Sequence, residues 1–192
     1  MTATASPPRL IPREILFGNP EKALAMISPD GKRLAYLAPE EGVLNVWVAP
    51  VSGEGKLGTG RPVTKDRSRG IRMYFWAEDR RSLIYLQDKG GDENWRLFQV
   101  DVDTLAERDL TPFEDTQAQV IGTDPHFPDD VLVALNLRNK RVHDVYRVSL
   151  KTGSAVLEVE NPGDVVGWLA DTAFQVRACK AALPDGGWEI RV

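Results

Sequence analysis

A unit of about 50 residues recurs along this chain of 192 residues, and no other feature constrains the fold as strongly. Asp30 and Asp79 occupy equivalent turns that lie 49 residues apart. The aromatic residues Trp47, Phe98 and Tyr146 occupy equivalent strands and are separated by 51 and 48 residues. A repeat of this length that contains several short strands is typical of a β-propeller blade.

Each repeat combines a tight turn with strand-forming residues. Pro29, Asp30 and Gly31 supply a fixed φ, a side-chain acceptor and a free φ in three successive positions. Valine, isoleucine and aromatic residues dominate the strands, as a half-buried pleated surface favours. The repeated aromatic strand is expected at 46–51, 97–102 and 145–150, and a fourth copy begins at 188–192, where the chain stops. Short outer strands are expected at 62–64 and 109–111.

These repeats predict an all-β fold, an incomplete β-propeller of about three and a half blades with a short N-terminal helical segment. The blades are expected at about 21–65, 66–112, 113–160 and 161–192, the last of them incomplete. Residues 1–20 are expected to form an arm with one or two helical turns, since Pro12 suits a helix start and Gly18 with Pro20 suits its end. An ordinary β-sandwich with chance internal similarity is the alternative fold.

Composition excludes several classes of protein. The net charge is -4, from 24 Lys and Arg against 28 Asp and Glu, whereas nucleic-acid binding favours a strongly basic face. No apolar run is long enough for a signal peptide or a membrane span. Cys179 is the single cysteine, so no intrachain disulfide can form, which is compatible with a reducing compartment. We therefore expect a cytoplasmic protein that binds neither nucleic acid nor membrane.

Four segments together resemble the start of prolyl oligopeptidase-family serine peptidases, nearest the acylaminoacyl-peptidase-like members. They are Ile-Pro-Arg-Glu-Ile-Leu-Phe-Gly-Asn-Pro at 11–20, Ser-Pro-Asp-Gly at 28–31, Gly-Asp-Glu-Asn-Trp at 91–95 and His-Asp-Val-Tyr at 143–146. The Ser-Pro-Asp-Gly turn occurs in many propellers, including the TolB type, and the opening segment with Gly-Asp-Glu-Asn-Trp is more specific. The resemblance covers nearly the whole chain.

The resemblance implies an architecture that this chain does not complete. Members of the family have a propeller, commonly seven-bladed, that caps a C-terminal α/β-hydrolase domain and restricts entry to short or unfolded peptides. The catalytic Ser, Asp and His lie in that domain, which we expect to be missing here. No catalytic residue is therefore assigned, and the chain as it stands is not expected to be an enzyme.

Two glycine-containing motifs look like functional loops but lack the necessary context. The nucleophile elbow is Gly-x-Ser-x-Gly at a strand-to-helix turn, and the nearest match here, at 66–70 around Ser68, begins with Asp66. Residues 53–58 spell the dinucleotide-binding pattern, but Gly60 and Pro62 follow where a helix would have to start. Both segments are interpreted as surface loops, so no cofactor is predicted.

The two histidines, His126 and His143, are the remaining candidates for metal binding or catalysis. His126 has possible oxygen ligands beside it in Asp124 and Asp129, but no second histidine is suitably spaced for zinc. A loop residue is the favoured interpretation of His126. His143 precedes a strand and is expected to be a hydrogen-bonded blade residue, so no metal site is predicted.

The acidic pair Asp92 and Glu93 is the one candidate substrate-binding feature. In dipeptidyl-peptidase relatives, an acidic pair from the propeller captures the free amine of the substrate. Two carboxylates in a partly dry cavity hold an ammonium group well. The pair lies in a hairpin loop with a different sequence context, so a turn that organises Trp95 is the alternative.

The favoured function is a non-catalytic propeller segment of a prolyl oligopeptidase-type serine peptidase, which gates and scaffolds peptide access to a hydrolase domain. The expected partners are that missing C-terminal domain or, through open blade edges, other copies of the chain. Peptide substrate is expected only in the full-length parent. The alternative function is a stand-alone TolB-like propeller module for protein–protein interaction.

Overall fold

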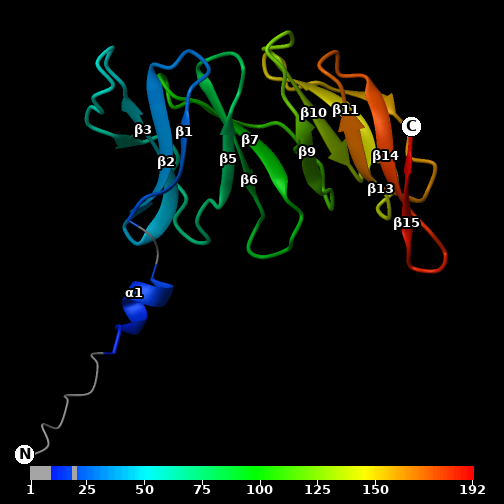
Figure 1. The fold of residues 1–192 in the computed structure, drawn as a ribbon, viewed down its shortest axis with the longest axis horizontal. Coiled ribbons are helices and arrows are strands. Elements are labelled where there is room, and N and C mark those ends of the chain that lie inside the picture. Colours follow the sequence, from blue (N-terminus) through cyan, green and yellow to red (C-terminus); the bar gives the residue numbers. More distant parts are fainter. Residues whose placement is uncertain (1–9, 19–20) are drawn as a thin grey trace, which may run out of the picture.

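The structure is a computed structural model that describes residues 10–18 and 21–192. Four antiparallel sheets stand side by side in an arc, and each sheet is one blade (Figure 1). Short strands joined by tight turns make up nearly all the regular structure of the described residues. The predicted all-β fold, an open and incomplete propeller, is confirmed.

Blades 1 to 3 have four strands each and blade 4 has three. Blade 1 consists of β1 (Ala23–Ile27), β2 (Arg33–Glu40), β3 (Val43–Pro50) and β4 (Arg61–Pro62). Blade 2 consists of β5 (Met73–Trp76), β6 (Ser82–Gln87), β7 (Arg96–Asp101) and β8 (Glu107–Asp109). Blade 3 consists of β9 (Ala118–Gly122), β10 (Asp130–Leu135), β11 (Asp144–Ser149) and β12 (Ala155–Val159). Blade 4 consists of β13 (Val165–Ala170), β14 (Val176–Ala182) and β15 (Trp188–Arg191).

The turn between the first two strands of a blade repeats in structure as well as in sequence. In blade 1 the Gly31 N–H donates to the Ser28 carbonyl at 2.8 Å, and the φ of Gly31 is 72°. Arg80 occupies the same position in blade 2 with a φ of 66°, and Phe174 does so in blade 4 with a φ of 56°. A positive φ suits glycine and strains other residues, so this turn is strained in blades 2 and 4.

Two threonines tie the outer strands to the third strand of their blades. The Thr64 hydroxyl accepts a hydrogen bond from the Val46 N–H at 2.9 Å, and the Thr111 hydroxyl accepts one from the Leu97 N–H at 2.9 Å. Both threonines are buried. A buried N–H without a partner is costly, so these hydroxyls complete the backbone hydrogen bonding where the outer strands end.

Hydrophobic cores lie between the blades. The cluster shared by blades 1 and 2 contains twelve buried residues, and so does the cluster shared by blades 2 and 3. The contact between the first strands of blades 1 and 2 also includes hydrogen bonds, because the Trp76 indole donates to the Met26 carbonyl at 3.0 Å and the Tyr74 hydroxyl donates to the Leu24 carbonyl. Each blade is therefore held by its neighbours.

Helix α1 (Arg13–Phe17) lies apart from the blades, below blade 1 (Figure 1). The predicted short helix is thus confirmed, and Gly18 caps it through a hydrogen bond from its N–H to the Glu14 carbonyl at 2.9 Å. Positions 1–9 and 19–20 of the predicted arm lie outside the described residues. Large apolar side chains along this segment are exposed, namely Leu10, Ile11, Ile15, Leu16 and Phe17.

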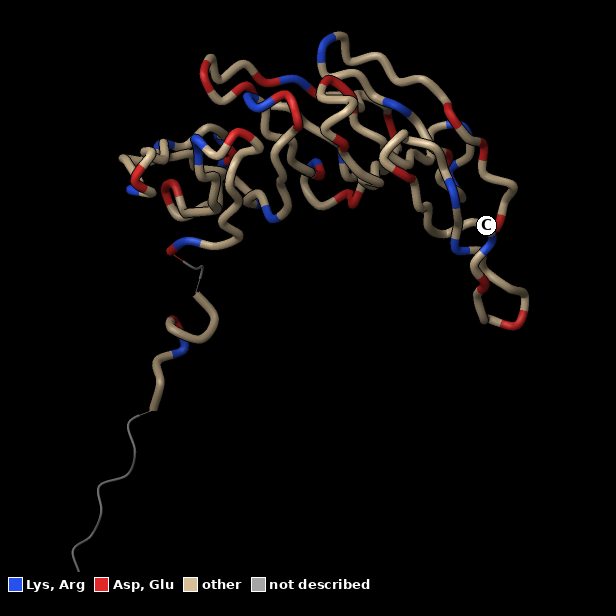
Figure 2. The backbone as a smooth tube through the Cα atoms, turned by 45° about the horizontal axis from the view of Figure 1, so that its top comes forward, with Lys and Arg blue, Asp and Glu red and all other residues tan. Residues whose placement is uncertain are grey.

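Charged residues of both signs are mixed along the arc of blades (Figure 2). No helix of the described residues is long and apolar enough to cross a membrane.

Candidate functional site

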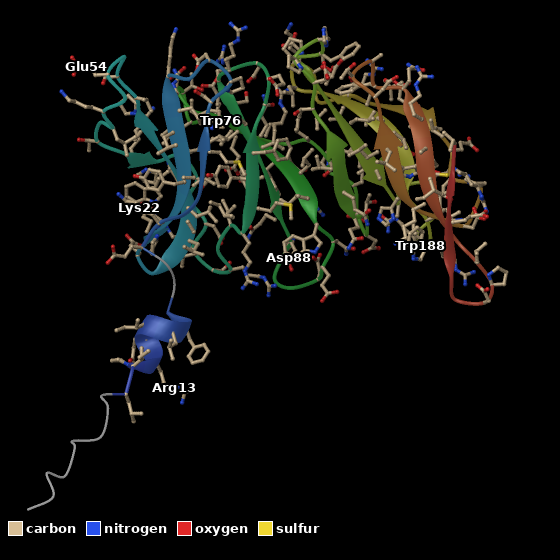
Figure 3. All side chains as sticks on the ribbon, in the orientation of Figure 1. Arg13, Lys22, Glu54, Trp76, Asp88 and Trp188 are labelled. Carbon is tan, nitrogen blue, oxygen red and sulfur yellow. The ribbon has the colours of Figure 1, made fainter. Side chains whose placement is uncertain are left out.

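The hairpin between β6 and β7, residues 88–95, carries the predicted acidic pair. It lies at the end of blade 2 where Figure 3 labels Asp88, on the same side of the arc as α1. We call this side the lower face. Strand β6 is almost wholly buried, and this rigid strand fixes where the hairpin begins.

Asp92 organises the hairpin. Its carboxylate accepts hydrogen bonds at 3.1 Å from the backbone N–H groups of Lys89 and Asn94. Local burial acts to raise the pKa of Asp92, but these hydrogen bonds and the charge of Arg96 together hold that pKa below its ordinary value. The carboxylate is therefore ionised at neutral pH and largely engaged within its own loop.

Glu93 follows with a different environment. Its φ is 58°, a strained value for a residue other than glycine. Its carbonyl oxygen accepts hydrogen bonds from the Trp95 N–H at 3.0 Å and from the Gln117 side chain at 3.1 Å. The residue is exposed, and within the described residues its carboxylate makes no hydrogen bond or ion pair. Glu93 thus presents a free anion at the lower face.

Asp88 and Arg69 fasten the hairpin to the loop that precedes β5. The Arg69 Nε lies 3.0 Å from the Asp88 Oδ1, and the Asp88 side chain is only 1% exposed. The Asp88 Oδ2 accepts a hydrogen bond from the Glu93 N–H at 3.4 Å. A Cβ at Gly91 would lie 2.8 Å from the Arg69 guanidinium, so glycine allows the arginine to cross the hairpin.

Sequence reasoning missed Asp88, Arg69 and Gln117. Their roles depend on contacts between segments that are 19 to 24 residues apart, which no local pattern reveals. The sequence did contain one indication of a buried polar residue here, because Asp88 comes directly after a strongly apolar strand. The assignment of Asp92 and Glu93 to substrate binding stays a prediction.

The other candidate residues lie on different loops of the fold. Ser68 lies in a surface loop with its hydroxyl 3.5 Å from the Asp66 carboxylate, without a strand-to-helix turn. The His126 Nδ1 lies 2.6 Å from the Asp124 carboxylate on a loop of blade 3. His143 is half-buried, and this burial lowers its pKa. No group of three or more His, Cys, Asp or Glu in the described part of the chain could hold a metal ion.

A cleft of about 780 Å³ opens on the upper face, between blades 2 and 3. Its lining includes an ion pair of Arg81 with Asp101 and another of Lys151 with Asp129. Arg108 donates to the backbone carbonyl of Lys151 at 2.8 Å. These charged groups already have partners inside the protein, so the cleft offers no concentrated charge of one sign.

Comparison with known proteins connects these features to a family. The chain is 44% identical over 181 residues to dipeptidyl aminopeptidase BIII of Pseudoxanthomonas mexicana, which covers 94% of this chain and 26% of that protein. The chain resembles the N-terminal propeller portion of prolyl oligopeptidase-family peptidases. The resemblance inferred from the sequence is thereby confirmed.

Solved structures show the same fold at lower identity. Puromycin hydrolase matches with a TM-score of 0.63 and 19% identity, covering 88% of this chain and 26% of that one. Prolyl oligopeptidase B from Galerina marginata matches with a TM-score of 0.61 and 15% identity, covering 89% and 24%. No protein-family model matches this chain. It spans about a quarter of the length of the curated relatives that it matches.

Proposed function

We propose that this chain is a non-catalytic propeller portion of a prolyl oligopeptidase-type serine peptidase, where it gates and scaffolds peptide access to a hydrolase domain. The observation that carries this proposal is the 44% identity to a dipeptidyl aminopeptidase, which extends over nearly the whole chain. Identity at that level, sustained over four blades, is a stronger guide to function than shared propeller architecture, since one fold serves many functions.

The lower face is the proposed docking side for the hydrolase domain. Helix α1 lies on this side and presents exposed apolar side chains, including Ile15, Leu16 and Phe17. Apolar side chains gathered on one short segment favour burial against a partner. The β6–β7 hairpin lies on the same side, where it would face a peptide entering between propeller and hydrolase.

Within this arrangement, the acidic pair is proposed to receive the free N-terminal amine of a peptide. Glu93 would supply the anion that binds the ammonium group, because its carboxylate is free among the described residues. Asp92 would shape the turn and add negative charge nearby. The strained φ of Glu93 supports this role, since such strain gathers at functional positions.

A chimera tests the proposal. The matched quarter of dipeptidyl aminopeptidase BIII is replaced by this chain, and hydrolysis of a chromogenic dipeptide is measured with and without an acetylated N-terminus. The chimera should cleave the free dipeptide and spare a folded protein substrate. Glu93→Gln should raise KM for the free dipeptide about tenfold, in line with loss of a charged hydrogen bond.

Glu54→Gln is the matched control, because Glu54 is an exposed glutamate at the far, upper end of blade 1 (Figure 3). It should leave KM unchanged. A folded chimera without activity would contradict the scaffold role. An active chimera in which Glu93→Gln behaves like Glu54→Gln would remove the amine-binding role alone.

The isolated chain is expected to show no peptidase activity on acetyl-alanine, proline or dipeptide substrates. Turnover that survives repurification and is lost in Ser68→Ala would contradict this. The alternative, a propeller module for protein–protein interaction, is favoured only by the fold shared with TolB from Acinetobacter baumannii. A chain that binds a protein partner but cannot replace the matched segment of the peptidase would support that alternative.

A further inference from the structure

Glu93 keeps a backbone conformation that its residue type does not favour. Its φ of 58° lies in the left-handed region, which is costly for a residue with a side chain and persists only where surrounding contacts enforce it. Gly90 and Gly91 in the same hairpin also have positive φ values, of 67° and 93°, but glycine adopts them without strain. Residue 93 is therefore the strained position of the hairpin, and contacts with the rest of the protein have to hold it.

Three hydrogen bonds hold the backbone of Glu93. Its N–H donates to the Asp88 Oδ2 at 3.4 Å, and the buried Asp88 side chain is in turn fixed by Arg69, whose Nε lies 3.0 Å from the Oδ1. The Glu93 carbonyl accepts one hydrogen bond from the Trp95 N–H at 3.0 Å and another from the Gln117 Nε2 at 3.1 Å. The contact from Gln117 comes from blade 3, and the other two come from within the hairpin.

Gln117 lies directly before β9 and is itself well anchored there. Its backbone N–H donates to the Asn136 Oδ1 at 2.6 Å. The N–H of the next residue, Ala118, donates to the Trp95 carbonyl at 2.7 Å, which ties the end of the hairpin to the start of blade 3. These backbone anchors fix where the Gln117 amide can reach, so the position of Glu93 is set by blade 3 as well as by blade 2.

We propose that Gln117 is a positioning residue for the carboxylate of Glu93. Its hydrogen bond to the Glu93 carbonyl keeps that backbone in the left-handed conformation, and the conformation fixes the direction in which the Glu93 side chain leaves the hairpin. Relaxation at this residue would redirect the carboxylate, and small misplacements of a binding group are costly. This role rests on the proposed capture of a peptide amine by Glu93. The amine site then depends on the junction between blades 2 and 3.

Gln117→Leu tests the role in the chimera described above, because leucine has a similar size and cannot donate. The KM for the free dipeptide should rise about fivefold, as expected for one neutral hydrogen bond, while kcat stays unchanged. The KM for the acetylated dipeptide should not change. Gln119→Leu is the matched control, since Gln119 lies two residues further along, and in the described part of the chain its side chain makes no hydrogen bond with the hairpin. It should leave both KM values unchanged.

A double-mutant cycle separates positioning from a general structural effect. In the Glu93→Gln background, Gln117→Leu should raise KM no further, because it acts through the carboxylate that is already lost. A second fivefold rise would overturn the proposal, and so would a Gln117→Leu variant that behaves like Gln119→Leu while Glu93→Gln raises KM. If Glu93→Gln itself leaves KM unchanged, the amine site is wrong and the positioning role is wrong with it.

The isolated chain gives a readout that does not depend on peptidase activity. Glu93→Gly should raise the thermal midpoint by about 2 °C, because glycine relieves the strain at this φ. The same change in the Gln117→Leu background should give a smaller gain, since residue 93 is then already free to relax. Equal gains in the two backgrounds would overturn the proposal, because Gln117 would not be holding the strained conformation.

Discussion

The junction between blades 2 and 3 and the junction between blades 3 and 4 are built differently. The first contains twelve buried hydrophobic residues, mostly aliphatic and drawn from both blades. The second contains three buried residues, Leu132, Val145 and Phe174, with partly buried neighbours around them. At this junction Phe127 and Phe174 stack with ring centroids 4.8 Å apart, and the Arg147 guanidinium lies about 5 Å from both rings. The junction of blades 2 and 3 is stabilised by extensive burial of aliphatic side chains, whereas the junction of blades 3 and 4 is stabilised by a few aromatic contacts.

Strand β10 offers the most direct test, because it has one leucine in each junction. Leu135 lies in the cluster between blades 2 and 3, and Leu132 in the cluster between blades 3 and 4, and both are fully buried. Leu135→Ala should lower the free energy of unfolding by about 4 kcal/mol, and Leu132→Ala by about 2–3 kcal/mol, since the smaller cluster can relax around the cavity. Chemical denaturation of both variants measures the difference. Equal losses would mean that the two junctions are equally rigid.

Phe174 provides a second test of the difference between the two junctions, because the junction of blades 3 and 4 is packed around a residue with a strained backbone conformation. The side chain is buried, yet its φ of 56° suits glycine better. Phe174→Ala should cost about 3 kcal/mol through lost packing. Phe174→Gly should cost about 1 kcal/mol less than Phe174→Ala, because glycine relieves the strain.

Arg80→Gly is the control for Phe174→Gly. Arg80 occupies the same turn position in blade 2, but its side chain is exposed, so its replacement removes strain without loss of packing. Arg80→Gly should raise stability slightly in thermal unfolding. If Phe174→Gly is less stable than Phe174→Ala, the turn in blade 4 is not strained in the way the φ value indicates.

The smallest effect concerns pH. The Arg177 side chain and the backbone N–H groups of Gln175 and Ala173 donate hydrogen bonds to Asp171, in the turn that carries Phe174, and they lower its pKa. A lowered pKa in the folded state stabilises the protein above the unfolded value of 3.8, and this stability is lost as the pH falls through the folded value. Asp171→Asn should therefore destabilise the protein at pH 6 and differ less from wild type near pH 2.5. A difference that is constant over this range would show that the carboxylate charge is not responsible.

The repeated parts of this fold were predictable from the sequence, and the parts that join blades were not. The equivalence of Trp47, Phe98 and Tyr146 survives in the sheets, where they pair with Tyr36, Tyr85 and Val133. Short outer strands were predicted at 62–64 and 109–111, but β4 ends at Pro62 and β8 at Asp109. Thr64 and Thr111 lie just beyond these strands, where their hydroxyls accept equivalent hydrogen bonds. These signals are local, because a blade is built from neighbouring segments of the chain.

Phe174 and Asp88 show why the remainder escaped prediction. Phe174 lies in a turn whose sequence lacks the Pro-Asp-Gly pattern. Only the backbone conformation, a positive φ, shows that Phe174 and Gly31 occupy equivalent turn positions. The burial of Asp88 depends on Arg69 from another loop. At the candidate site the sequence located the hairpin and the acidic pair, but it could not separate the engaged carboxylate of Asp92 from the free one of Glu93.

Because each of the three hydrophobic clusters between blades is shared by only two adjacent blades, the molecule need not open all at once. In a linear array of this kind, the free energy of local opening varies from unit to unit. Blade 4, which rests on the sparsest cluster, can detach while blades 1 to 3 keep their cores. Amide hydrogens in β13, β14 and β15 would then exchange with solvent well before those of β6 and β10, as a gradient of protection along the chain.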